Sequence, residues 1–193
     1  MNVLFLDSTF KDLNVGLLTD NNFYKVNYEA FQRQSELMIP EIKKLLDENN
    51  IDYKDIQKIV VTNGPGSYTG LRIALTIAKI YGYITKADIH VLSSLEVLQQ
   101  YKENSICLMN ARSNRSYIGV YNGNSCLLED QVLSNDEVKK YIESHPNYIV
   151  CGETEYLGIN GHNSNILDNM KNLYNDSNKI KDVYELKAKY LKD

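Results

Sequence analysis

The stretch GPGSYTGLRI at residues 64–73 decides how this chain is interpreted. It follows the apolar run KIVVTN at 58–63 and opens a long apolar segment that continues to about residue 85. Glycine tolerates positive φ and close backbone approach, and Ser67 or Thr69 can cap a helix that begins near Tyr68. The stretch therefore predicts a tight turn between a buried strand and a helix.

The same turn has the geometry of an anion site, because glycine-rich amides precede a helix N-terminus. It is neither a Walker A loop, since Gly70 is followed by Leu71 and Arg72, nor a GxGxxG turn. A structural turn without ligand and a loop that contacts nucleotide are equally supported by the residues alone. The residues predicted to contact a phosphate or nucleotide are Gly64, Gly66, Ser67, Thr69, Gly70 and Arg72.

Strand and helix patterns alternate around this turn and predict an α/β fold. Strand-like runs at 3–7, 14–19 and 23–28 precede a helix from about residue 35, the strand at 58–63 and the second helix. This order predicts an antiparallel meander, extended by parallel strands and covered by helices. The second half has weaker runs at 105–111, 116–122, 126–133 and 148–152, typical of a shortened, degenerate repeat. We predict domains at 1–92 and 93–193, with a poorly packed asparagine-rich loop at 160–179.

Composition excludes several classes of function. The net charge is −4 and no basic stripe is visible, so the isolated chain is not expected to hold nucleic acid. The three cysteines are far apart, and the three histidines are not spaced to share a metal, so we expect reduced thiols and no metal. No apolar run reaches the ~20 residues of a membrane span, and no leader is evident, so a cytoplasmic location is predicted.

Two catalytic alternatives remain to be weighed. Asp7 ends the first strand, where a phosphotransferase would place a magnesium-water ligand or base, but no glycine follows it to admit a phosphate. We favour the interpretation that Asp7 and Ser8 close the strand by local hydrogen bonds. A hydrolytic role for Ser67 is less supported still, because the sequence has no GxSxG elbow.

The decapeptide GPGSYTGLRI closely resembles GPGSFTGLRIG, the signature of the TsaB (YeaZ) family. LDST at 6–9, QSELMIP at 34–40, LSSLEVL at 92–98 and MNARSNRSY at 109–117 resemble further family segments, as YELKAKYLK at 184–192 does more faintly. Gln34, Asn110 and Arg115 depart from the usual histidine, aspartate and glutamate of the family. The resemblance implies an actin-like or hexokinase-like ATPase (ribonuclease H-like) fold of two related subdomains.

The resemblance also implies a function. TsaB proteins are non-catalytic partners that pair with a TsaD-type subunit and support formation of threonylcarbamoyladenosine in tRNA, at the adenosine next to the anticodon. A TsaE-type ATPase in the complex, a homodimer when the chain is alone, and contact with tRNA only through the complex are implied as well. No cofactor is predicted, although ATP or ADP at the partner interface is left open. The alternative is a small ATP-binding phosphotransferase of the same fold.

The helix after the turn indicates where a partner would bind. Its apolar residues cover about two thirds of the helix circumference, whereas an apolar arc of about 100° is enough for a helix to dock on one sheet. Part of the apolar surface is therefore left over. Ala74, Ala78 and Gly82 form a shallow ridge that another helix could approach closely. The alternative is that the helix is sandwiched inside its own subunit. The residues predicted to form the interface are Leu37, Met38, Leu71, Ala74, Leu75, Ala78 and Gly82.

Overall fold

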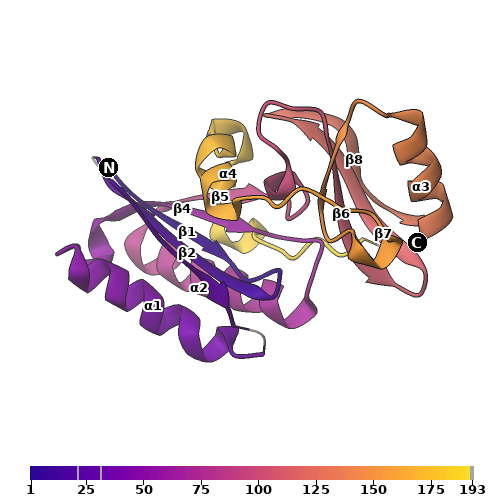
Figure 1. Ribbon diagram of the computed structural model, residues 1–193. Coiled ribbons are helices and arrows are strands. Elements are labelled where there is room, and N and C mark those ends of the chain that lie inside the picture. Colours follow the sequence, from indigo (N-terminus) through magenta and orange to yellow (C-terminus); the bar gives the residue numbers. More distant parts are fainter. Residues whose placement is uncertain (21, 31, 192–193) are drawn as a thin grey trace. The chain divides into compact units, whose positions relative to one another are not determined.

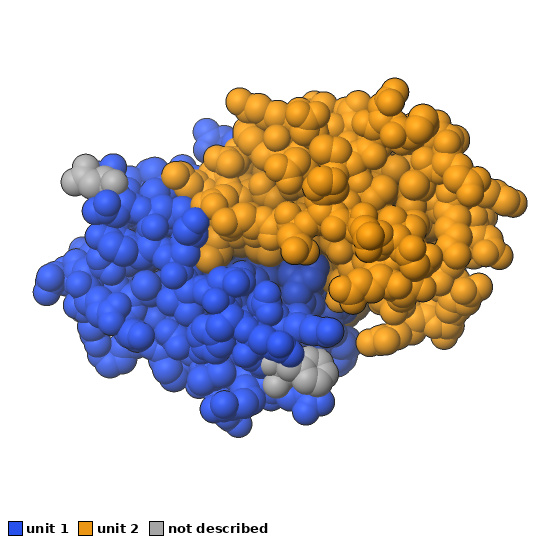
Figure 2. All heavy atoms as spheres, viewed as in Figure 1, with its two compact units in different colours: residues 1–92, 174–188 blue, residues 93–173, 189–193 orange. Residues whose placement is uncertain are grey.

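The computed structural model describes residues 1–20, 22–30 and 32–191, which form two compact units (Figures 1 and 2). Unit 1 comprises residues 1–92 and 174–188, and unit 2 comprises residues 93–173 and those after 188. The sequence predicted a boundary after residue 92, with the whole C-terminal region in the second domain. Residues 174–188 return to unit 1 because Leu186 is buried in its core, where Ile180 and Val183 also pack.

Unit 1 is built on a five-stranded sheet with the order β3-β2-β1-β4-β5. β1 (Asn2–Asp7), β2 (Asp12–Leu18) and β3 (Phe23–Glu29) are antiparallel, whereas β4 (Ile56–Thr62) and β5 (Asp88–Leu92) add in parallel. The central strand β1 pairs Leu4 with Leu17 on one side and with Ile59 on the other. This is the meander with parallel extension that the sequence predicted.

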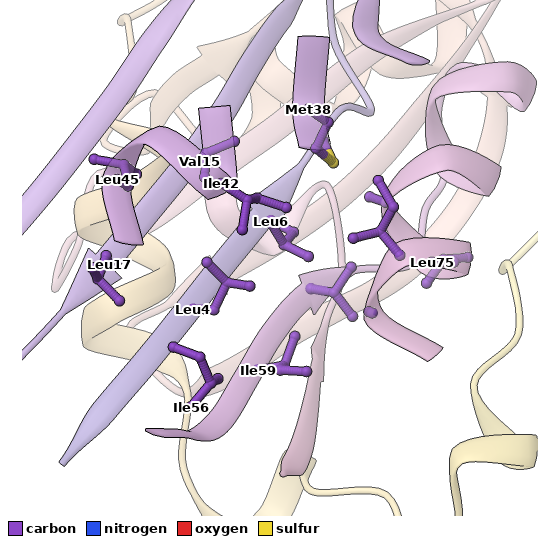
Figure 3. Packing of buried hydrophobic residues seen from close by; sticks show 14 of the residues in the cluster. Leu4, Leu6, Val15, Leu17, Met38, Ile42, Leu45, Ile56, Ile59 and Leu75 are labelled. Atoms are coloured by element: carbon purple, nitrogen blue, oxygen red, sulfur yellow. The ribbon is translucent and has the colours of Figure 1, made fainter. Parts of the chain in front are cut away.

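Helices α1 (Gln34–Glu48) and α2 (Tyr68–Thr85) pack on one face of this sheet (Figure 1). Alternate residues of a strand point to opposite faces, so Leu4 and Leu6 enter the core beneath the helices while Phe5 points the other way. Met38 and Ile42 of α1 and Leu75 of α2 meet these leucines (Figure 3). On the opposite face, Phe5 packs edge to face against Phe23 and Tyr174, with ring centroids 5.3 and 5.6 Å away.

Unit 2 repeats this strand order in a shorter form. Its sheet has the order β8-β7-β6-β9, formed by β6 (Ser105–Arg112), β7 (Arg115–Asn122), β8 (Ser125–Ser134) and β9 (Ile149–Gly152). The first three strands are antiparallel and β9 is parallel to β6, as β4 is to β1. Among the described residues no strand of unit 2 corresponds to β5. Helices α3 (Asn135–Ser144) and α4 (Ile166–Leu173) complete the unit.

The asparagine-rich region is better packed than its composition predicted. α4 buries Leu167, Met170 and Leu173, and the buried side-chain amide of Asn169 donates to the carbonyl oxygens of Val97 and Gln99 at 2.8 and 2.7 Å. Asparagine is useful here because it satisfies backbone acceptors inside the unit.

Short 3₁₀ helices connect the larger elements of both units. They are η1 (Tyr53–Asp55), η2 (Glu96–Leu98), η3 (Glu155–Leu157), η4 (Asp176–Asn178) and η5 (Val183–Glu185). In the described part of the chain, no helix combines the length and the apolar character that crossing a bilayer requires.

Candidate functional site

The 64–70 turn is held against the end of β1 by the chain itself. Ser8 Oγ donates to the carbonyl oxygen of Gly70 at 2.7 Å, and the amide of Ser67 donates to the carbonyl oxygen of Thr9 at 3.2 Å. Gly70 must be glycine, since a Cβ there would lie 1.8 Å from the Ser8 carbonyl oxygen. The turn therefore connects β4 to α2 tightly and packs against the end of β1, as expected for a turn with a structural role.

The six residues predicted to contact a phosphate are only partly presented to solvent. Gly64 and Gly70 are buried, and Gly66 is half-buried. Ser67, Thr69 and Arg72 are exposed on the first turn of α2. Ser67 Oγ accepts the amide of Gly70 at 3.3 Å and so caps the helix, as predicted. Contact with a phosphate or nucleotide stays a prediction, which the exposed side chains of this turn would have to make.

Asp7 is fully buried beside this turn. Its Oδ1 accepts from the amide of Thr9 at 3.2 Å and from Thr62 Oγ1 at 2.5 Å, while Oδ2 accepts from Asn14 Nδ2 at 2.9 Å. Burial raises the pKa of Asp7, and these hydrogen bonds act in the opposite direction. The carboxylate is thus an interior acceptor that joins β1, β2 and β4, and a bound nucleotide could not reach it in this conformation.

The three departures from the TsaB pattern are divided between the two units. Gln34 begins α1, and its Nε2 lies 3.4 Å from the carbonyl oxygens of Phe10 and Lys11. Asn110 is in unit 2, where its amide donates to Glu153 Oε2 at 3.1 Å. Arg115 begins β7 opposite Arg112. Asn110 and Arg115 therefore lie near each other at one end of the β6–β7 hairpin, whereas Gln34 belongs to unit 1.

The residues predicted as the interface face mainly inward. Met38, Leu71, Ala74, Leu75, Ala78 and Gly82 are buried in unit 1, and Leu37 is half-buried. The small residues serve close packing within the subunit, since a Cβ on Gly82 would lie 2.5 Å from Ile89. These buried residues are therefore not available on the surface of unit 1.

Large apolar side chains nevertheless remain exposed on α1, α2 and η5. The exposed fractions are 53 % for Ile39, 51 % for Ile80, 58 % for Tyr83, 56 % for Ile84 and 72 % for Tyr184. On α2 they are Ile80, Tyr83 and Ile84, none of which belongs to the ridge of Ala74, Ala78 and Gly82. Ile80, Tyr83, Ile84 and Tyr184 lie together, and exposed apolar side chains that gather in this way often mark binding surfaces.

A groove of about 480 Å³ lies between α2 and η5. We name it the α2–η5 groove, and it is lined by Lys79, Ile80, Tyr83, Ile84, Val183 and Tyr184. The contribution of η5 was not predicted from the sequence, because residues 174–188 were assigned to the second domain. The apolar pair Val183 and Tyr184 within a charged C-terminal stretch was the available signal.

A cluster of titratable groups lies inside unit 2. The buried carboxylate of Asp130 accepts from Ser93 Oγ at 2.6 Å, from Lys189 Nζ at 3.0 Å and from Tyr121 Oη. Burial, reinforced by the charge of Asp130, raises the pKa of the nearby Glu96 to about 7. Among the described residues no group of three or more histidine, cysteine or carboxylate side chains is arranged to hold a metal ion.

The family model for TsaD, tRNA N6-adenosine threonylcarbamoyltransferase, matches residues 28–145. The chain belongs to this family. Its curated relatives include TsaB of Bacillus subtilis, 31 % identical over 144 residues, and TsaB of a Buchnera aphidicola strain, 29 % identical over 132 residues. These matches cover 72 % and 65 % of this chain but only 62 % and 63 % of the two relatives. Together with the YeaZ structure below, they confirm the TsaB (YeaZ) assignment that the 64–73 decapeptide indicated.

Two further similarities extend over nearly the whole chain. The uncharacterized protein MG208 of Mycoplasma genitalium is 27 % identical over 194 residues, which is 98 % of this chain and 94 % of that protein. YeaZ from Pseudomonas aeruginosa superposes with a TM-score of 0.83 over 98 % of this chain and 99 % of that one, at 18 % identity. The chain thus has the predicted ribonuclease H-like α/β fold, with YeaZ-like architecture in both units.

Proposed function

We propose that this chain is a non-catalytic partner subunit of a TsaD-type threonylcarbamoyltransferase and supports formation of threonylcarbamoyladenosine in tRNA. The observation that carries the proposal is that large apolar side chains of α1 and α2 are exposed, namely Ile39, Ile80, Tyr83 and Ile84. Removing such a surface from water stabilises a complex by roughly 25 cal/mol per Å² of apolar area, before the cost of association. Relatives named for threonylcarbamoyladenosine biosynthesis supply the pathway.

The buried state of Asp7 supports a non-catalytic role. A phosphotransferase needs its carboxylate within reach of bound nucleotide and magnesium, and here both carboxylate oxygens accept hydrogen bonds from neighbouring strands. One solved Pseudomonas aeruginosa protein of the same fold is described as having similarity to peptidase YeaZ. In this chain Ser67 Oγ serves as a helix cap. We therefore expect no ATPase, kinase or peptidase turnover from the isolated chain.

The proposal includes the composition of the complex. The catalytic partner is a TsaD-type subunit, joined by a TsaE-type ATPase, and the chain forms a homodimer through the same helices when it is alone. With a net charge of −4, the isolated chain should bind tRNA only weakly, so tRNA is engaged through the complex.

The test replaces Ile80 and Ile84 together by aspartate. Both side chains are more than half exposed, so the monomer should stay folded, whereas charges placed in an apolar contact should abolish binding of the TsaD-type protein of the same organism. Sedimentation velocity measures the complex, circular dichroism the fold, and a reconstituted tRNA reaction the modification.

The matched control is Leu127→Asp, an exposed apolar residue of β8 in unit 2. The control should bind normally. A folded double variant that binds the TsaD-type protein with unchanged affinity would refute the partner surface. Turnover by the isolated chain that disappears in Asp7→Ala would replace this function by the phosphotransferase.

A further inference from the structure

A β-bulge turns one carboxylate of unit 2 toward the interior. The pairing of β7 with β8 is irregular around Gly119, where β8 has one residue more than β7. The side chain of Asp130 lies in this bulge and is fully shielded from solvent. A Cβ on Gly119 would lie 2.6 Å from Asp130 Oδ1, so the glycine leaves the space that the carboxylate occupies. The strand geometry thus buries a charged group, which requires partners.

One of these partners comes from the C-terminal tail, by which we mean residues 189–191. The chain leaves unit 1 after residue 188, and Lys189 Nζ lies 3.0 Å from Asp130 Oδ2. Ser93 Oγ donates to the same oxygen at 2.6 Å, and Tyr121 Oη donates to Oδ1. Because a buried carboxylate is costly without its cation, Asp130 holds Lys189 and with it the tail.

Glu96 of η2 is connected to the same carboxylate. Its Oε2 accepts the amide of Ser93 at 3.4 Å, and the hydroxyl of Ser93 is the donor to Asp130. Burial, reinforced by the charge of Asp130, raises the pKa of Glu96 to about 7, whereas the charge of Lys189 acts in the opposite direction. Glu96 therefore changes its charge near neutral pH, and Lys189 favours the ionised form.

The other titratable groups around Glu96 and Asp130 are Tyr121 of β7, Cys126 and Glu129 of β8, and Cys107 of β6. Burial raises the pKa of the tyrosine and of both cysteines above their ordinary values, which already lie at 9 or higher, so these three stay neutral near pH 7. Glu129 is exposed. A change of charge in the cluster near neutral pH is therefore assigned to Glu96.

We propose that Lys189 and Asp130 form a latch that holds the C-terminal tail on unit 2, and that ionisation of Glu96 tightens this latch. With Glu96 ionised, Lys189 interacts with two negative charges, whereas with Glu96 protonated it interacts with Asp130 alone. The coupling is reciprocal, so ionised Glu96 strengthens the attachment of Lys189 by the same factor by which Lys189 weakens proton binding at Glu96. The inference does not rest on the proposed function, because the latch involves no residue of α1 or α2.

The first experiment measures the mobility of the tail. The chain has no tryptophan, and Tyr190 is 48 % exposed, so Tyr190→Trp places a single fluorophore beside Lys189. Acrylamide is an uncharged quencher, so its access to the indole reports exposure without an electrostatic bias. The quenching constant should be about twofold larger at about pH 6 than at about pH 8.

Three variants in the Tyr190→Trp background separate the contributions. Lys189→Met should show the strongest quenching at both pH values, because the latch is absent. Glu96→Gln should keep the weaker latch at both pH values, because glutamine resembles the protonated acid. Lys187→Met, which removes the charge of an exposed lysine in the same segment, is the matched control and should keep the pH dependence. Circular dichroism should show all variants folded.

The second experiment tests the reciprocal effect without the fluorophore. Carbon-13 NMR of the Glu96 carboxyl group gives the midpoint of its titration in the full chain. Lys189→Met should increase the proton affinity of Glu96 about threefold and so move the midpoint to higher pH, whereas Lys187→Met should leave it unchanged.

Each outcome either supports or overturns the inference. Equal quenching in the parent protein and in Lys189→Met would overturn the latch. A Glu96 midpoint near 4.5, a midpoint that Lys189→Met does not move, or a pH dependence that survives Glu96→Gln would overturn the coupling. A more exposed tail in Lys189→Met together with a displaced Glu96 midpoint would support both parts, whether or not the chain binds a TsaD-type protein.

Discussion

Units 1 and 2 share a strand order but differ in what their helices present to solvent. α2 in unit 1 leaves Ile80, Tyr83 and Ile84 exposed, whereas α3 in unit 2 buries Val138 and turns Asp136, Glu137, Lys139 and Lys140 outward. An apolar helix face beyond what the sheet covers costs solubility unless a partner covers it. α2 therefore presents an apolar surface and α3 a polar one.

The largest effect should come from Ala78→Glu, which tests whether the inner face of α2 belongs to the core of unit 1. Ala78 is fully buried, and a buried unpaired carboxylate together with the added volume should cost more than about 4 kcal/mol. We expect loss of the native circular dichroism signal and of the cooperative urea transition.

Thr76→Glu is the control for this experiment, because Thr76 is exposed on the same helix. It should remain folded with nearly unchanged stability. A folded Ala78→Glu protein that has lost only its association would restore the alanine ridge as the interface.

Asp7→Ala tests the polar joint of unit 1. The substitution leaves the Thr62 hydroxyl, the Thr9 amide and the Asn14 amide without their buried acceptor, so we expect a loss of about 3 kcal/mol in urea unfolding. Asp47→Ala, which removes an exposed ion pair of α1, should cost less than about 0.5 kcal/mol. Equal effects of the two substitutions would show that the joint is not a stabilising network.

Glu96 provides a pH test for unit 2. Its folded-state pKa of about 7 lies above its ordinary value of 4.5, so between these values the folded chain holds a proton that the unfolded chain has released. This contribution to the free energy of unfolding is fully present below about pH 4.5 and is lost as the pH rises through about 7.

Glu96→Gln removes this titration. The free energy of unfolding of the variant minus that of the wild type should be about 1 kcal/mol larger at about pH 8 than at about pH 5. The effect is limited to this size because the side chain is only half-buried. Urea unfolding of both proteins at the two pH values measures this. Parallel stability profiles for wild type and variant would contradict the assigned shift.

The smallest effects should come from the two helix caps. Ser67 caps α2 through one bond to Gly70, whereas Ser134 caps α3 in a reciprocal arrangement with Glu137. Ser67→Ala and Ser134→Ala should each cost about 1 kcal/mol. The loss should be larger at Ser134, because the Glu137 amide loses its acceptor and the Glu137 carboxylate, which accepts the amide of residue 134, loses its hydrogen bond from the hydroxyl. Thermal unfolding ranks them, and a larger loss at Ser67 would reverse the expected order.

Local patterns in the sequence predicted most of the fold and the turn, but not which apolar side chains of α2 are exposed. The 64–73 segment contains its own turn residues and cap, so its local structure could be predicted from these residues alone. Which face of α2 is buried could not be predicted in this way, because its apolar arc is wide enough to dock on the sheet through the alanine ridge or through its isoleucine residues. No feature of the helix alone shows that Gly82 must lie against Ile89.

By itself, the sequence determined the order of strands and helices, the cap at Ser67, the repeat and the family, because these depend on periodicity and on residues adjacent in the chain. Only the tertiary structure decided that Asp7 is closed off by Thr62 and Asn14, that residues 174–188 return to unit 1, and that Tyr184 borders the same groove as Ile80. These features join residues that are distant in the chain. Their positions depend on packing and on satisfying buried polar groups across several elements at once, which no local pattern records.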